Sequence, residues 1–295
     1  MKKLLLLFLP LVAILAGCEK ENEKSKGQEG LLTYGKLIKS ATVSIMGEDY
    51  MEYNFRYDTN DRLINMDIQV NDSYYDEPIC INCSYEYTES KVSVNVAGDD
   101  AYCDLNNDYV AEYMFDADGT PYSCKREGNV ETQMFHLGTR ESYIYENGYI
   151  SKRHVMGVEN YDPSTSFSVE YEWKERNLQK MLCNMLDEDP MEFRYTYDSR
   201  VDKSNLDLIK LMYYLNYYRG GHYTADKSTF KGMASQNLIK TYTIFEGTEE
   251  AETMNFDYRL DSDGYVMEVT TIMGGSPYMV MCLEYNNARR RFNQY

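Results

Sequence analysis

The sequence predicts an all-β protein: one large, curled antiparallel meander of about 14 to 16 strands with a single inserted helix. Three observations support this fold class. A short aromatic motif recurs along the chain, the segments around it alternate between apolar and polar residues, and turn residues interrupt the alternation. A twisted sheet of this size must curl, close or split into two layers, so a barrel-like shape is expected.

The first 17 residues have the pattern of a lipoprotein signal peptide. Lys2 and Lys3 precede an apolar run, and Leu15-Ala16-Gly17-Cys18 supplies small residues before a cleavage point. The run is shorter than the roughly 20 residues that a bilayer-spanning helix requires. Leu-Ala-Gly-Cys matches the lipobox of bacterial lipoproteins, which predicts lipidation of Cys18 and anchoring to the outer membrane. The alternative is an ordinary signal peptide followed by a chance cysteine.

Residues 18–30 are expected to form a lipidated cysteine and a disordered, charged tether, because residues 19–30 include no apolar side chain. An acidic stretch at this place resembles a surface-export signal of Bacteroides-type lipoproteins. The alternative is a tether without an address, so both a surface-exposed and a periplasm-facing location stay open. Residues 31–295 are expected to form a single β-meander domain.

The recurring motif is aromatic, any residue, aromatic, then usually a polar turn residue. Its first six turn positions lie 24 to 30 residues apart. Each period therefore has room for two strands and two turns. The clearest copies are Phe55-x-Tyr57, Tyr85-x-Tyr87, Tyr113-x-Phe115, Tyr143-x-Tyr145, Tyr171-x-Trp173 and Tyr195-x-Tyr197, with later copies at Tyr258-x-Leu260 and Leu283-x-Tyr285.

The flanks of the motif alternate with period two, as strands with one buried and one wet face do. Before the first turn, Met51, Tyr53 and Phe55 share one face, while Glu52 and Asn54 share the other. Turn chemistry occurs where the alternation breaks. The turn sequences are Asp116-Ala-Asp-Gly119, Glu146-Asn-Gly148 and Asp261-Ser-Asp-Gly264, in which Gly and Asn provide the positive φ that hairpins need.

One insertion breaks the repeat between Asp198 and Phe256. Its apolar residues recur at helical spacing and Gly220-Gly221 ends the run, which predicts a helix near residues 205–219 with a cap at Ser204. We expect its apolar stripe to pack against the apolar face of the sheet. The sheet would then curl with its apolar side inward around the helix and need not span a membrane.

These features together resemble a family of Bacteroides-type lipoproteins of unknown function. The resemblance rests on the lipobox, the charged tether, the tyrosine-rich hairpins, the late helix and the segment Phe230-Lys-Gly-Met-Ala-Ser-Gln-Asn-Leu238. It implies a porin-like, antiparallel β fold and a place in the cell envelope. It implies no functional residue, since no catalytic motif defines that family.

Six cysteines remain after Cys18, and their pairing cannot be read from the sequence. They are Cys80, Cys83, Cys103, Cys124, Cys183 and Cys282. Cys80-x-x-Cys83 lacks the second pair or the histidines of a zinc site and the βαβ context of a redox site. We therefore interpret these cysteines as structural, either bridged or buried.

No cofactor, metal or catalytic site is predicted. The chain has no G-x-S-x-G, P-loop or H-E-x-x-H motif, and its three histidines lack ligand spacing. The D-x-D-G turns could hold calcium only weakly, and a plain turn is the simpler interpretation. The net charge of −18 disfavours nucleic acid as a partner, because it repels phosphate.

The function expected from these observations is a lipid-anchored, non-catalytic binding or interaction module for a glycan or a protein. Its 30 tyrosines suit half-wet sheet surfaces, and some could stack on sugars. The candidates for stacking are Tyr74, Tyr75, Tyr161, Tyr213 and Tyr217. The alternative is a hydrolase acting on an envelope or dietary polysaccharide through paired carboxylates. Among 48 acidic residues such pairs are unavoidable, so their presence alone carries little weight.

Overall fold

The structure is a computed structural model that describes residues 35–71, 77–98, 109–128, 139–157, 166–185, 189–212, 224–246 and 249–287. The chain divides into two units, Met1–Leu32 and Thr33–Tyr295, and every described residue belongs to the second.

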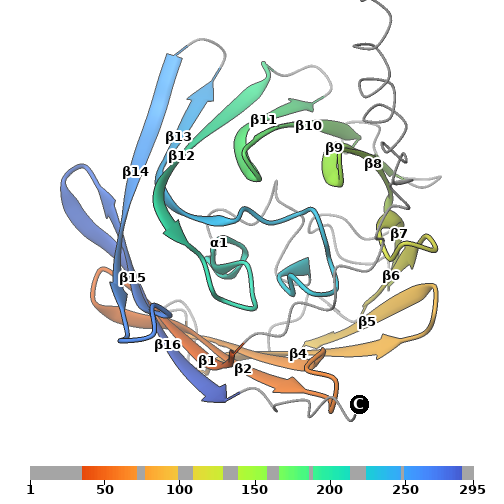
Figure 1. Cartoon of the computed structure of the whole chain (residues 1–295), viewed down its shortest axis with the longest axis horizontal. Helices are drawn as coiled ribbons and strands as arrows, with labels where there is room; N and C mark the ends of the chain where they lie inside the picture. Colours follow the sequence, from red (N-terminus) through yellow and green to blue (C-terminus); the bar gives the residue numbers. More distant parts are fainter. Residues whose placement is uncertain are drawn as a thin grey trace, which may run out of the picture. The chain divides into compact units, whose positions relative to one another are not determined.

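Sixteen antiparallel strands in the described part of the chain form one closed barrel, in which each strand pairs with its neighbours in sequence (Figure 1). The strands are β1 Lys36–Ile45, β2 Glu48–Tyr57, β3 Leu63–Val70, β4 Ile79–Tyr87, β5 Lys91–Gly98, β6 Tyr109–Phe115, β7 Pro121–Gly128, β8 Thr139–Glu146, β9 Tyr149–Gly157, β10 Phe167–Lys174, β11 Asn177–Met185, β12 Met191–Val201, β13 Asn237–Glu246, β14 Glu249–Leu260, β15 Val266–Met273 and β16 Ser276–Asn287. The predicted all-β meander and its strand number are confirmed.

The barrel closes between its first and last strands. Lys36 lies opposite Asn287, and Ile45 lies opposite Met279. This pairing joins residues about as far apart in the sequence as the fold allows, so local patterns carry no sign of it. Closure pairs the two strands that would otherwise be the edges of the sheet.

The predicted alternation separates an apolar lumen from a polar outer wall. On β2, Met51, Tyr53 and Phe55 are buried, whereas Glu52 and Asn54 are exposed. The buried side chains of all strands belong to one cluster that fills the inside of the barrel. The prediction that the apolar side faces inward is therefore confirmed.

The turns behave as their residues predict. Asn147 and Gly148 have φ values of 53° and 79°, and Gly264 has a φ of 84°. The positive φ of Asn147 and Gly148 matches the twist of a two-residue hairpin. Several strands also carry a register shift before they end, for example between Arg56 and Tyr57 on β2 and between Thr196 and Tyr197 on β12.

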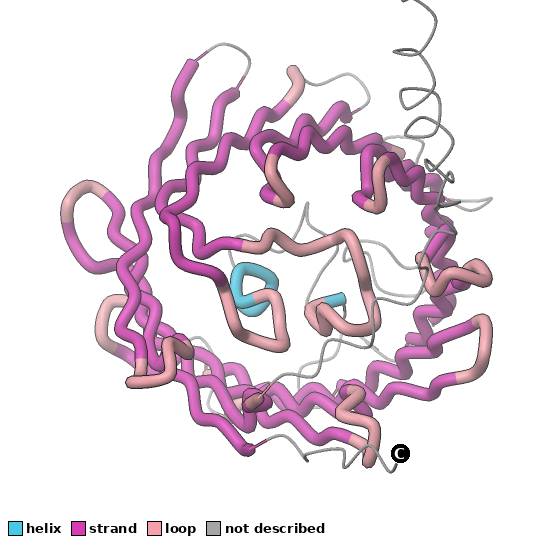
Figure 2. Tube along the Cα trace, viewed as in Figure 1, coloured by secondary structure: helices cyan, strands magenta, loops and turns pink. Residues whose placement is uncertain are grey.

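The insertion after β12 lies inside the ring of strands (Figures 1 and 2). We call its described parts, residues 202–212 and 224–236, the plug. The two parts run antiparallel: Asp207 N–H donates to Ala225 O at 2.8 Å, and Lys227 N–H donates to Asn205 O at 3.1 Å. Phe230 packs edge-on against Tyr113 of the wall, with 4.9 Å between ring centroids.

The predicted helix over 205–219 is wrong in its start and cap. The only described helix, α1, covers Leu208–Leu211, and residues 213–219 lie outside the described part of the chain. Leu206 instead forms a β-bridge with Asp226, and Asp207, rather than Ser204, caps the turn by accepting a bond from Ile209 N–H. Met212 is extended and ends the helix. The predicted apolar contact with the sheet is present, because Leu208, Ile209 and Leu211 are all buried.

The Cys80-x-x-Cys83 pair places its thiols on opposite faces of β4. Cys80 is exposed on the outer wall, and Cys83 is buried in the lumen, because residues three apart on a strand point to opposite sides. No disulfide joins any two of the described cysteines Cys80, Cys83, Cys124, Cys183 and Cys282. Cys103 lies outside the described residues.

Candidate functional site: the stoppered barrel lumen

Six aromatic residues near the ends of even-numbered strands share one structural task. Each packs against the apolar core and donates a side-chain hydrogen bond to a backbone carbonyl on the preceding strand of the barrel. The donors and acceptors are Tyr57 to Ile38 (2.8 Å), Tyr87 to Leu63 (2.7 Å), Trp173 to Ile150 (2.6 Å), Tyr197 to Leu178 (2.6 Å), Tyr258 to Ile239 (2.8 Å) and Tyr285 to Val266 (2.8 Å). We call these six residues the aromatic collar.

Burial is the main reason that the pKa of a collar phenol such as Tyr57, Tyr87 or Tyr258 is raised above its usual range. These hydroxyls therefore stay protonated and keep donating throughout the physiological pH range. The collar lies at the rim of the turns that follow even-numbered strands, which we call the plugged rim.

The plug is bound to the collar by polar contacts. Asn205 Oδ1 accepts from Ile38 N–H at 2.9 Å, and its Nδ2 donates to the Tyr57 hydroxyl at 2.9 Å. Ser235 lies 2.8 Å from the Tyr197 hydroxyl and accepts from the N–H of Leu178 at 3.1 Å. The plug side chains therefore hydrogen-bond to backbone N–H groups and tyrosine hydroxyls of the wall.

Gly232 allows the plug backbone to approach the wall closely. Its carbonyl accepts from Ile150 N–H at 3.1 Å, and its φ is 72°. A Cβ at this position would lie 2.3 Å from the carbonyl oxygen of Gly148. Only glycine fits there, since a side chain would collide with backbone and the φ would be strained.

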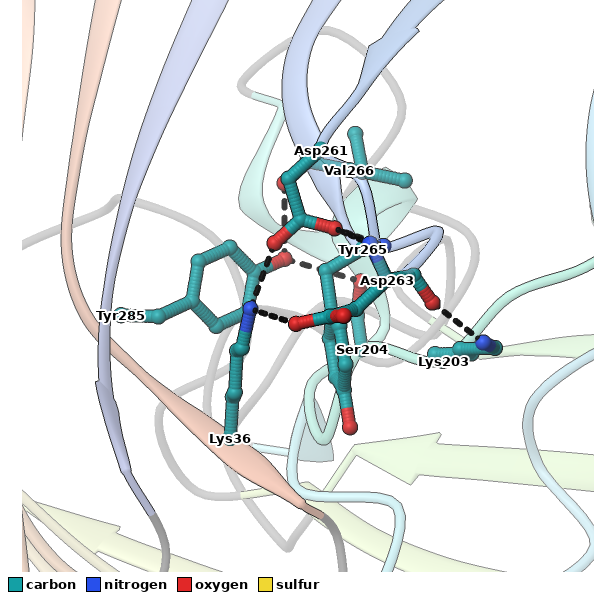
Figure 3. Close-up of polar contacts among 8 residues, drawn as sticks. All are labelled: Lys36, Lys203, Ser204, Asp261, Asp263, Tyr265, Val266 and Tyr285. Atoms are coloured by element: carbon teal, nitrogen blue, oxygen red, sulfur yellow. Dashed lines mark hydrogen bonds and ion pairs between the residues drawn. The ribbon is translucent and has the colours of Figure 1, made fainter.

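Charged groups fasten the plug and β1 to the turn after β14 (Figure 3). Lys36 Nζ lies 2.6 Å from Asp261 and 2.7 Å from Asp263, and Lys203 of the plug donates to the Asp263 carbonyl. The Lys36 ammonium lowers the pKa of the Asp261 carboxyl, and the N–H of Tyr265 adds to this effect. In this D-x-D-G turn the Lys36 ammonium therefore contacts both carboxylates.

A buried ion pair lies on the lumen side of the wall. Arg153 Nε is 2.7 Å from Glu141, and the Tyr143 hydroxyl donates to the same carboxylate at 2.7 Å. Beside this pair is a cavity of about 20 Å³ lined by Tyr143, Ile150, Arg153, Tyr171, Trp173, Leu178, Thr224 and Met233. Such a volume admits about one water molecule. It is too small for an organic substrate.

The outer wall carries charged and polar side chains along its strands, with exposed apolar side chains such as Ile64, Ile144 and Met156 among them. Ion pairs cross between neighbouring strands, for example Lys152–Glu170 at 2.9 Å and Arg259–Glu268 at 2.8 Å. Thr196 and Thr241 contact each other at 2.6 Å on the same wall. A membrane-spanning barrel has the opposite arrangement, with an apolar outer band about 25 Å tall.

Several residues singled out from the sequence cannot be placed. Cys18 and the stacking candidates Tyr74, Tyr75, Tyr161, Tyr213 and Tyr217 lie outside the described residues. Within the described ranges, no group of three or more His, Cys, Asp or Glu side chains could hold a metal ion. No described helix is long and apolar enough to cross a membrane.

Sequence reasoning missed the buried ion pair, although the pattern carries a signal for it. Glu141 shares its face with Tyr143 and Tyr145, and Arg153 shares its face with Val155. A charge of each sign therefore falls on the buried face of two strands joined by the Asn147-Gly148 turn. Opposite charges at core positions of one hairpin predict a buried pair.

Together the collar, the plug and the wall define a stoppered barrel with charged side chains on its outer wall and an apolar interior. The fold is similar to two porin-like proteins of known crystal structure. One, from Bacteroides uniformis ATCC 8492, is 13% identical with a TM-score of 0.60 and covers 84% of this chain and 98% of its own. The other, from Bacteroides vulgatus ATCC 8482, is 12% identical with a TM-score of 0.56 and covers 85% of this chain and 99% of its own. At these identities the likeness concerns the fold alone.

No protein-family model matches the chain, and no curated protein matches it in sequence. The structural neighbours nevertheless support the porin-like fold that the sequence resemblance implies.

Proposed function

We propose that the protein is a lipid-anchored envelope lipoprotein whose barrel stands in water beside the membrane and serves as a non-catalytic binding module. The observation that carries this proposal is the inverted polarity of the barrel. Its outer wall bears ion pairs and its lumen is apolar, the reverse of a porin.

The energetic cost of placing this wall in lipid is large. An Arg or Lys on the lipid face of a barrel costs about 2–4 kcal/mol at the bilayer midplane. Arg56 and Arg194 are exposed on the wall, and acidic residues such as Glu52 and Glu170 are interspersed among them. A barrel held by acyl chains on Cys18 does not need to pay this cost, since the chains alone supply the anchoring.

The plug supports a role other than conduction. Its residues Asn205, Ser235 and Gly232 hydrogen-bond to three separate strands of the wall, β1, β11 and β9. A channel would need a polar, water-filled path at this rim. The lumen instead contains apolar side chains of wall and plug packed in one cluster.

The hydrolase alternative finds less support in the described residues. The buried carboxylates Glu141 and Asp226 accept hydrogen bonds from neighbouring structural groups, Arg153 in the first case and Ser228 and Thr229 in the second. Glu170 and Glu172, two acids on the outer face of β10, are exposed. Trp173 on the same strand points to the other side and donates to Ile150 O. An open wall lacks the enclosure that raises the pKa of a general acid.

Two measurements on cells and membranes test the proposal. Metabolic labelling with a fatty-acid probe should mark the wild-type protein and leave Cys18→Ala unlabelled and released from membranes. Purified protein added to planar bilayers should produce no stepwise conductance. Labelling of the Cys18→Ala protein would refute the anchor, and reproducible channels would refute the non-spanning barrel.

A further inference from the structure

The outer wall contains one open hollow of about 400 Å³ across β2, β3, β4 and β5. Its volume falls within the range of about 300–1,000 Å³ that is usual for small-ligand sites. It differs from the small cavity in the lumen in that it faces solvent and polar side chains surround it.

The hollow exists because short side chains interrupt the wall. Cys80 on β4 and Ala97 and Gly98 on β5 occupy its floor. We call the longer side chains that also line the hollow its border; they are Asn54, Asp67, Gln69 and Asn82. The strand register therefore fixes the depression, since residues that share a face repeat at every second position.

The border consists of amides and one carboxylate in register. Asn54 lies opposite Asp67, and Asp67 lies opposite Asn82, which gives a continuous polar row across three strands. Asn82 Nδ2 donates to Asp67 Oδ1, and Gln69 follows one pleat further along, opposite Cys80. Gln69 Nε2 donates to Asn71 Oδ1, so side-chain hydrogen bonds hold the row in place. Each amide of the row carries both donor and acceptor groups.

We propose that this hollow binds a neutral glycan through the hydroxyl groups of its sugar rings. This inference rests on the proposed binding function and gives it a site and a ligand class. Amide groups such as those of Asn54 and Asn82 offer a donor and an acceptor side by side, which matches vicinal hydroxyls. The single carboxylate, Asp67, already has Arg56 at 3.4 Å, so the hollow has no charge surplus that would select an ionic ligand.

Two exposed cysteines in the described part of the chain make the site testable in one molecule. Cys80 lies on the floor of the hollow, whereas Cys282 lies exposed on β16, outside it. Full-length protein is alkylated with iodoacetamide in the presence of neutral hexasaccharides of glucose, mannose, xylose or N-acetylglucosamine. Peptide mass spectrometry then measures the modification rate at each cysteine. Binding in the hollow should slow alkylation at Cys80 and leave Cys282 unchanged.

Two variants test whether the protection of Cys80 from alkylation depends on the hollow. Ala97→Trp fills the floor and should abolish the protection, whereas Glu86→Trp, on the same wall but outside the hollow, should retain it. Asn82→Ala should weaken the apparent affinity about tenfold, since one lost hydrogen-bonding group contributes on the order of that factor.

Each outcome decides the inference. Protection at neither cysteine with all four sugars, or equal protection at both, overturns the glycan site. Glycan binding that survives Ala97→Trp also overturns it, but leaves the proposed binding function standing. Failure of the anchor and conductance tests would instead refute the proposed function without affecting the cysteine result.

Discussion

Arg153 and Glu141 form a doubly hydrogen-bonded ion pair inside the barrel, with Nε and Nη2 at 2.7 and 2.8 Å from the two carboxylate oxygens. Their side chains are 3% and 0% exposed. Burial alone would lower the pKa of Arg153, but the Glu141 carboxylate outweighs burial and raises it above the usual range. The pair therefore stays ionised, and each partner compensates the other's desolvation.

We expect Glu141→Met and Arg153→Met each to lower the free energy of unfolding by about 3–5 kcal/mol, because each leaves one buried charge unpaired. The double variant with methionine at both positions should lose much less than the sum of the single losses. Urea denaturation of the four proteins measures this coupling. Additive losses would show that the two side chains do not interact.

Asn205 fixes the plug to β1 and β2, so its removal should loosen the stopper. Asn205→Ala leaves the buried N–H of Ile38 without its acceptor and should cost about 1–3 kcal/mol. Asn255→Ala, an exposed change on the outer face of β14, is the matched control and should change stability by less than about 0.5 kcal/mol. Equal effects of the two substitutions would contradict the assigned role of Asn205.

The sequence predicts the strands of the barrel wall far better than the structure of the plug inside it. Alternation around Tyr53 and Phe55 identifies the strands and their buried face, because burial on one side of a sheet imposes period two. Pairing of Lys36 with Asn287 is non-local and leaves no trace in any short window. The predicted helix was wrong in its start, because a bridge between Leu206 and Asp226 replaced the first helical turn. Tertiary packing, rather than local propensity, decided that segment.

The aromatic repeat illustrates a second limit. Its spacing reveals the hairpins, whereas the hydrogen bonds of its aromatic side chains depend on how the neighbouring strand and the plug are placed. Tyr197 donates to Leu178 O on the preceding strand and also contacts Ser235 of the plug. Contacts between wall and plug therefore had to be seen in three dimensions.

The turn after β2 should make the free energy of unfolding depend on pH in the acid range. Burial would raise the pKa of Asp58, but hydrogen bonds from the backbone and side chain of Arg62 and from Asn60 N–H lower it overall. A carboxyl with a lowered pKa stabilises the fold above its unfolded pKa of about 3.9, and this contribution disappears as pH falls through the folded value.

Asp58→Asn should therefore destabilise the barrel by about 1 kcal/mol at pH 7, because it removes the charge that orders the turn. The difference from wild type should shrink below about pH 4, where Asp58 itself becomes protonated. Chemical denaturation at pH 7, 5 and 3.5 provides the comparison, with the outer-wall variant Asp257→Asn as control. A difference that stays constant across this range would show that the charge of Asp58 is irrelevant.

The opposite orientation of Cys80 and Cys83 predicts two distinct thiol reactivities. Cys80 is exposed and should react with iodoacetamide in the native protein. Cys83 is 0% exposed, and burial raises the pKa of its thiol, so its thiolate is both scarce and inaccessible. It should react only after unfolding in urea.

Oxidation with copper phenanthroline should yield no Cys80–Cys83 disulfide, because the two thiols lie on opposite sides of one strand. Peptide mass spectrometry with and without urea tests both expectations, and a Cys80–Cys83 crosslink in folded protein would contradict the register of β4.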